Sequence, residues 1–243
     1  MQKFIVVALL FSSCAPQLYV PNTRNVPLFR QQGEFQGTVS LTTGLEGQLA
    51  YAPGKHLAII TNGSFLKYYE SAQKYNRKHQ YLEGGIGYYN ATRNYRIEIF
   101  TGYGFGQGTS YAANYYFTPY FGQKDLVATG KYNRFFLQPT FGTNNPGFNL
   151  AFTLRASLVN FTSFSSNDNN PAFDVVTIQP DEGPQFFLEP AATGKFPIAG
   201  NLHGLVQLGL NVAVPNDAYF DYVPIQFAIG IQLNTASLRS RVY

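Results

Sequence analysis

Apolar and polar residues alternate along most of this chain with a period of two, the pattern of β-strands whose two faces meet different surroundings. The clearest stretch is residues 223–234, in which Val, Ile, Phe or Leu occupies every odd position up to 233. Residues 149–160 and 204–214 repeat the pattern. Shorter or interrupted stretches follow the same rule. They are residues 35–41, 45–51, 57–65, 81–89, 95–105, 126–141 and 185–191.

The regular stretches are close to the roughly 9 to 11 residues that a tilted strand needs to span a membrane. The connections between them alternate between short turns and longer loops, as in outer-membrane barrels. The pattern therefore predicts an all-β fold for residues 34–243: an antiparallel up-and-down transmembrane β-barrel of about 8 to 10 strands. An even strand number brings both termini to the short-turn side. A soluble antiparallel barrel or sandwich with its apolar face inward stays open as an alternative.

Composition supports a sheet with an apolar outer face and a neutral inner face. Of 243 residues only 12% are charged and 16% are aromatic, against about 25% charged in ordinary globular chains. The net charge of +4 is too small and scattered to indicate nucleic acid as a partner. Tyrosines gather near the ends of the predicted strands, which is typical of an interfacial aromatic girdle. They are Tyr51, Tyr68, Tyr69, Tyr88, Tyr89, Tyr95, Tyr115, Tyr116, Tyr120, Tyr219 and Tyr222.

The N-terminus predicts export. Residues 1–13 have a basic start at Lys3 and an apolar run at residues 4–11, which is too short to span a bilayer and reads as a signal peptide. Residues 10–14 resemble a lipobox that ends in Cys14, the only cysteine of the chain. We therefore expect lipid attachment at Cys14, followed by an extended tether in residues 14–33 that contains several prolines.

Charged residues are rare on the polar faces of the predicted strands, and each needs a partner in a narrow lumen. These residues are Glu46, Glu83, Arg96, Glu98, Arg134, Arg155 and Glu189. They predict either an ionic, hydrogen-bonded plug that keeps the barrel closed or a polar pathway or small-ligand site. A barrel of this strand number is usually filled by its own side chains, which favours the plug.

No catalytic constellation stands out. His56, His79 and His203 are the only histidines, and none stands at a spacing to serine that predicts a nucleophile–base pair. The single cysteine and the isolated histidines give no metal-ligand pattern, so we expect no metal and no cofactor. Gly102, Gly104 and Gly106 alternate with aromatic residues inside a strand, which predicts close packing and not a phosphate loop. The aromatic residues 111–121 predict an outer loop.

Cys14 with its proline-bearing tether, the run Gly33-Glu34-Phe35-Gln36-Gly37, and residues 45–65 with their Tyr-Ala-Pro turn resemble Bacteroidota outer-membrane barrel lipoproteins. The resemblance implies a bacterial outer-membrane location with lipid as a partner, and it leaves another envelope protein open as a second partner. The acidic cluster that tends to mark surface export in such lipoproteins is missing after Cys14, so a periplasm-facing anchor is expected.

The function expected from these patterns is that of a noncatalytic outer-membrane β-barrel lipoprotein with a structural or accessory role in the envelope. A narrow channel or lipid-modifying enzyme is one alternative. A periplasmic, lipid-tethered soluble binding module is the other.

Overall fold

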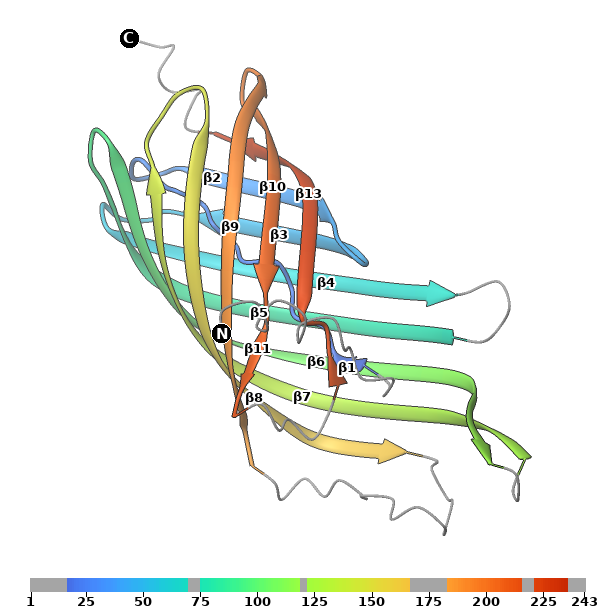
Figure 1. Cartoon of the computed structure of the whole chain (residues 1–243). Helices are drawn as coiled ribbons and strands as arrows, with labels where there is room; N and C mark the ends of the chain where they lie inside the picture. Colours follow the sequence, from blue (N-terminus) through green and yellow to red (C-terminus); the bar gives the residue numbers. More distant parts are fainter. Residues whose placement is uncertain (1–16, 70–74, 119–121, 167–182, 216–220, 236–243) are drawn as a thin grey trace, which may run out of the picture.

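The chain forms one closed β-barrel of antiparallel strands, in a computed structural model that describes residues 17–69, 75–118, 122–166, 183–215 and 221–235 (Figure 1). The wall strands are β2 (Phe35–Leu41), β3 (Leu45–Tyr51), β4 (Leu57–Tyr69), β5 (Tyr75–Ala91), β6 (Tyr95–Thr118), β7 (Gly122–Thr143), β8 (Asn149–Ser166), β9 (Gln185–Ala199), β10 (Leu202–Leu210) and β13 (Ile225–Asn234). Strand β11 (Val212–Val214) follows β10 along β9, and β1 (Gln17–Tyr19) pairs in parallel with β12 (Asp221–Tyr222).

Each wall strand pairs with its neighbours in sequence, from β2 through to β10, and β10 pairs in turn with β13. The barrel closes where β13 pairs with β2, with Gly230 opposite Ser40. The predicted fold class, an up-and-down antiparallel barrel with about 8 to 10 strands, is confirmed. The described residues contain no helix long and apolar enough to cross a membrane.

The two ends of the barrel differ. One end, called here the short-turn end, carries the connections at residues 52–56, 92–94, 144–148 and 200–201. The opposite end, called the long-loop end, carries the tight turn at residues 42–44 and the connections that follow β4, β6, β8 and β11. Strands β4 to β8 run further toward the long-loop end than predicted, and β6 takes in most of the aromatic residues expected in a loop. The alternation fades there because outward residues such as Lys67, Lys78 and Gln107 are polar.

The outer wall is apolar around the whole barrel. Large apolar side chains occupy most of the outward positions, and many are about half exposed, such as Val39 and Phe227, each at 58%. On β6 the outward residues from Tyr95 to Phe105 are apolar except Thr101, and the next two, Gln107 and Thr109, are polar. This gives an apolar belt of about the height that a bilayer requires, with a polar rim at the long-loop end.

Aromatic side chains edge the belt at the short-turn end, where Tyr51, Tyr88 and Tyr95 are exposed. Two tyrosines of the predicted girdle are placed differently. Tyr89 is buried inside the barrel and donates a hydrogen bond to Gly54 O at 2.8 Å, and Tyr222 packs edge-on against Phe187. The side chains of Tyr68, Tyr69, Tyr115 and Tyr116, together with Tyr120 and Tyr219, lie outside the described part of the chain.

The glycines of β6 make room for aromatic side chains inside the barrel. A Cβ on Gly104 would lie 2.2 Å from the hydroxyl of Tyr81, and one on Gly106 would lie 2.5 Å from the ring of Tyr132. The glycine–aromatic alternation therefore serves close packing, as the sequence predicts. Tyr81 and Tyr132 are both buried in the lumen.

Candidate functional site: a lumen occupied by the N-terminal segment

The segment that precedes the barrel lies inside it. Residues 18–29 are all buried, and several of their side chains are completely so, including Tyr19 and Phe29. We call residues 17–29 the lumenal segment. Apart from β1 it has no regular secondary structure. Within the stretch predicted as an extended tether, residues 18–29 therefore fill the lumen, a location that the sequence does not predict. Residues 1–13 and Cys14 lie outside the described residues.

The segment passes from one end of the barrel to the other. At the long-loop end β1 pairs with β12, and Tyr19 packs beside Tyr132 and Phe187, with ring centroids 5.3 and 5.0 Å away. At the short-turn end Phe29 packs with Ala52 and Tyr89. The chain then leaves the lumen, and Gly33 N donates to Ala52 O at 2.7 Å immediately before β2 begins.

Barrel side chains replace the hydrogen bonds that the backbone of the segment would make in a helix or sheet. Pro21 and Pro27 lack a backbone donor and discourage either structure. Gln207 both accepts from Arg24 N at 2.8 Å and donates to Arg24 O at 2.9 Å. Gln138, Gln226 and Gln48 donate to the carbonyl groups of Asn25, Pro21 and Thr23, respectively. The glutamines of the inner wall thus satisfy a buried, irregular backbone, which would otherwise be costly.

Four of the seven predicted lumen charges meet in one cluster at mid-barrel. Arg134 forms an ion pair with Glu83, and its Nη1 lies 4.0 Å from Glu189 Oε1. Arg155 Nη1 lies 3.7 Å from Glu83 Oε1 and 3.9 Å from Glu189 Oε2. Each of these side chains is at most 1% exposed. Two cations and two carboxylates therefore balance one another where water is excluded.

The lumenal segment completes this cluster. Asn22 donates to Glu83 Oε1 at 2.8 Å, and its own oxygen accepts from Arg134 and Arg155. Tyr19 donates its hydroxyl hydrogen to Glu189 Oε1 at 2.8 Å. The guanidinium of Arg134 also lies 4.5 Å from the centre of the Tyr81 ring, a cation–π contact. The ionic cluster thus binds the wall strands to the segment as well as to one another.

The other three predicted charges are buried at separate places and each holds the segment. Glu46 accepts hydrogen bonds from the backbone and hydroxyl of Thr23. Glu98 accepts from Phe29 N at 2.8 Å, and Arg96 donates to Leu28 O at 2.6 Å. Leu28 has a φ of 59°, which is rare for a bulky residue, and its side chain fits where a Cβ on Gly142 would clash. The seven predicted lumen charges therefore form one cluster of four residues, and each of the other three contacts the lumenal segment separately.

Sequence reasoning missed two cations of the lumen. Arg24, 1% exposed, donates to Gln226, Asn211 and Leu210 O, but it lies in the segment interpreted as a tether. Lys195 donates to the carbonyl groups of Val26 and Pro27. Lys195 stands on the same face of β9 as Glu189, so extending that predicted strand past residue 191 would have found it.

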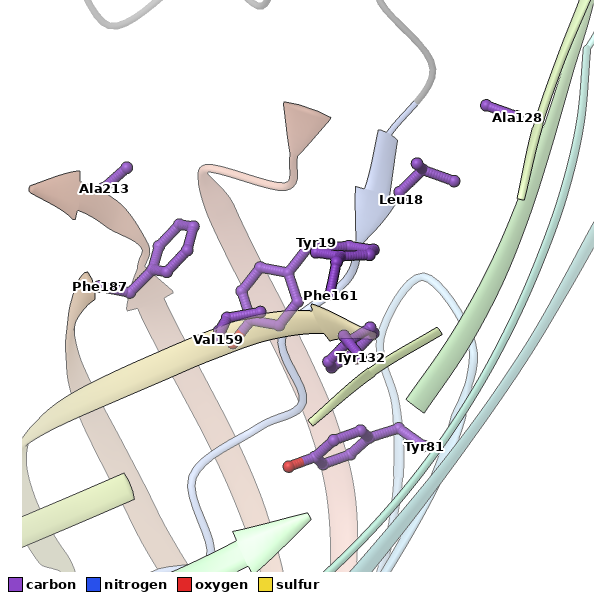
Figure 2. Close-up of a cluster of buried hydrophobic side chains, with 9 residues drawn as sticks. All are labelled: Leu18, Tyr19, Tyr81, Ala128, Tyr132, Val159, Phe161, Phe187 and Ala213. Carbon is purple, nitrogen blue, oxygen red and sulfur yellow. The ribbon is translucent and has the colours of Figure 1, made fainter. Parts of the chain in front are cut away.

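Aromatic residues seal the lumen on both sides of the ionic cluster. Toward the long-loop end, Leu18 and Tyr19 of the segment lie among wall residues (Figure 2). The wall residues are Tyr81, Ala128, Tyr132, Val159, Phe161, Phe187 and Ala213. Toward the short-turn end, Phe29 packs among Ala50, Ala52, Ala58, Ile60, Tyr89, Phe100 and Phe136. The segment is therefore held by apolar contacts at each end and by polar contacts between them.

The histidines do not assemble a catalytic group. His79 is buried beside the rings of Tyr81 and Tyr132, and its Nε2 lies 2.8 Å from the hydroxyl of Tyr132. His56 Nδ1 lies 3.1 Å from Tyr89 O, and His203 Nδ1 lies 3.3 Å from Asn201 O. Among the described residues, no hydrogen bond joins a serine to any of them, and no three His, Cys, Asp or Glu side chains come together as a metal site.

Comparisons with known proteins give a distant structural likeness. No protein-family model and no curated protein sequence matches the chain. Among solved structures, it is similar to the KdgM porin, at 9% identity over 82% of this chain and 98% of the porin, with a TM-score of 0.36. A major outer membrane protein from Thermus thermophilus matches at 13% identity over 83% of this chain and 98% of its own, also at 0.36. TM-scores this low carry no conclusion about function.

Proposed function

We propose that this protein is a noncatalytic β-barrel lipoprotein of the bacterial outer membrane, with a structural or accessory role in the cell envelope. The observation that carries the proposal is the combination of an apolar outer wall with a lumen occupied from end to end by the chain itself. The apolar belt suits lipid, whereas a soluble barrel would turn such a face inward. The segment occupies the path that a channel would need, and in the described part of the chain no serine is hydrogen-bonded to a histidine.

The expected lipid attachment at Cys14 is part of this proposal. It is supported by the apolar run and small residues that precede the cysteine. The barrel provides a second, independent hold on the membrane, because an apolar belt surrounds its outer wall. Lipid is thus the main partner, and another envelope protein is the natural candidate for a second one.

The test combines gel mobility with lipid labelling. In outer-membrane fractions of cells fed labelled palmitate, we expect unboiled protein to run faster than boiled protein, because a closed barrel resists detergent until it is heated. Label should appear in the wild type and disappear in Cys14→Ala. A chain without any mobility shift that is found in the soluble periplasm would refute the membrane-spanning proposal. A shifted but unlabelled wild type would refute lipidation alone.

Placing a charge on the apolar belt should destabilise the protein only in a membrane. Leu154 points outward from the middle of the apolar stretch of β8 and is 47% exposed. We expect Leu154→Arg to lower the free energy of unfolding in lipid vesicles by about 2 to 4 kcal/mol, because the cation would lie in hydrocarbon. Urea titration followed by tyrosine fluorescence measures this, since the chain has 18 Tyr and no Trp.

The matched control is Gln107→Arg, which places the same charge on the polar outer rim of β6. Its effect should stay within about 0.5 kcal/mol, as for most surface substitutions. Equal effects of the two substitutions in vesicles would mean that the belt does not face lipid.

A further inference from the structure

The direction in which the lumenal segment crosses the barrel determines on which side the N-terminus emerges. The C-terminal side of the lumenal segment lies at the short-turn end of the barrel, where Gln32 donates to Pro53 O at 2.8 Å. The N-terminal side of the segment lies at the long-loop end, where β1 pairs with β12 and the carbonyl of Leu18 lies against Gly108. Strand β6 continues beyond Gly108 toward the long-loop end, up to Thr118.

The distance between the two ends of the lumenal segment is greater than the few residues between Cys14 and Gln17 can span. Strand β8 passes from Ala151, beside Val26 and Leu28, to Val159, beside Tyr19. That stretch corresponds to about 25 Å at roughly 3.3 Å per residue. Cys14 precedes Gln17 by three residues, which reach at most about 10 Å. Cys14 is therefore confined to the neighbourhood of the long-loop end.

In the described part of the barrel, wall side chains and the lumenal segment together occupy the lumen. The ionic cluster fills the middle of the barrel with side chains at most 1% exposed, and the aromatic residues around Tyr19 and Phe29 close both sides of it. Residues that precede Gln17 would have to displace these contacts to return to the short-turn end.

We infer that the N-terminus lies on the cell-surface side of the outer membrane, and that an acyl group on Cys14 enters the outer leaflet. The inference rests on the proposed function, in which the short turns face the periplasm as in other outer-membrane barrels. It reverses the expectation that the anchor faces the periplasm, which rested on the missing acidic cluster after Cys14 and agreed with an even strand number. The strand count is even as expected, but the lumenal segment adds one more crossing of the membrane, inside the barrel.

Single introduced cysteines test this topology in whole cells. Cys14, once acylated, does not react with maleimide, so a new cysteine is the only reactive thiol. The variants are Pro16→Cys for the N-terminus, Lys55→Cys for the short-turn end and Lys78→Cys for the outward face near the long-loop end. The reagent is a maleimide coupled to a polyethylene glycol too large to cross the outer membrane, and the readout is the gel shift before and after lysis.

We expect Pro16→Cys to be labelled on intact cells to the same extent as Lys78→Cys, and Lys55→Cys to be labelled only after lysis. Labelling of Pro16→Cys only after lysis, like Lys55→Cys, would overturn the inference and leave the membrane-spanning barrel intact. Equal labelling of Lys55→Cys and Lys78→Cys on intact cells would overturn the proposed function and the inference together. Ala15→Cys is a second reporter, and failure of both N-terminal cysteines to react before denaturation also counts against the inference.

Discussion

A chain that lacks residues 17–29 is expected to conduct ions across a planar bilayer, whereas the full-length chain is expected to be silent. The wall strands pair with one another around the whole barrel, so the closed ladder does not depend on the segment. Without the segment, the buried charges of Glu83, Arg134 and Arg155 would line a water-filled path. The deletion variant should also lose heat stability, because it forfeits the aromatic contacts of Tyr19 and Phe29.

A second variant separates loss of volume from loss of specific contacts. Residues 17–29 are replaced by a glycine–serine stretch of the same length, which has no side chains to anchor it. This variant should conduct as well, because an unanchored stretch leaves the lumen part of the time. A deletion variant that still shows the heat-dependent gel shift but remains silent would mean that the wall collapses on itself, and that the segment is not what closes the lumen.

The second large effect concerns the ionic cluster. We expect Arg134→Ala to lower the free energy of unfolding by about 3 to 5 kcal/mol, because it leaves Glu83 and Glu189 buried with only one cation between them. Glu83→Ala should lower the free energy of unfolding by a similar amount, because it leaves Arg134 and Arg155 buried with only one carboxylate between them. Urea unfolding in lipid vesicles measures both.

The double variant Glu83→Ala with Arg134→Ala should lose less than the sum of the single losses, since neither charge is then left without its partner. Lys131→Ala, at an exposed outward position of β7, is the control and should change stability by less than about 0.5 kcal/mol. Additive losses in the double variant would show that the two side chains contribute separately and not as a pair.

The sequence predicts the wall of this barrel far better than its filling. Outward and inward positions alternate within a few residues of one another, so the belt of β13 and the inward charges of β6 and β8 can be identified locally. Strand ends are less certain where both faces are polar, as at Lys67 and Lys78 in the hairpin of β4 and β5.

No pattern in the neighbouring sequence predicts that the lumenal segment fills the barrel. Asn22, Thr23 and Arg24 read as an ordinary polar linker, because their partners come from distant strands. Arg155 lies 133 positions from Asn22, and Gln226 lies 202 positions from Arg24. The available clue is the number of inward glutamines, such as Gln207, whose amide groups bind the backbone of the segment.

The enclosed segment also constrains the order of assembly. Residues 17–29 are synthesised before the wall that surrounds them, and the last seam, between β13 and β2, joins the final strand to the first. The wall must therefore close around a segment that is already in place, or the segment must be pulled through afterwards past Tyr19 and Phe29. Contacts between residues so far apart in sequence form late and slowly. Until β13 arrives, the chain remains an open sheet with two unpaired edges, which is the stage at which it most needs protection from other chains.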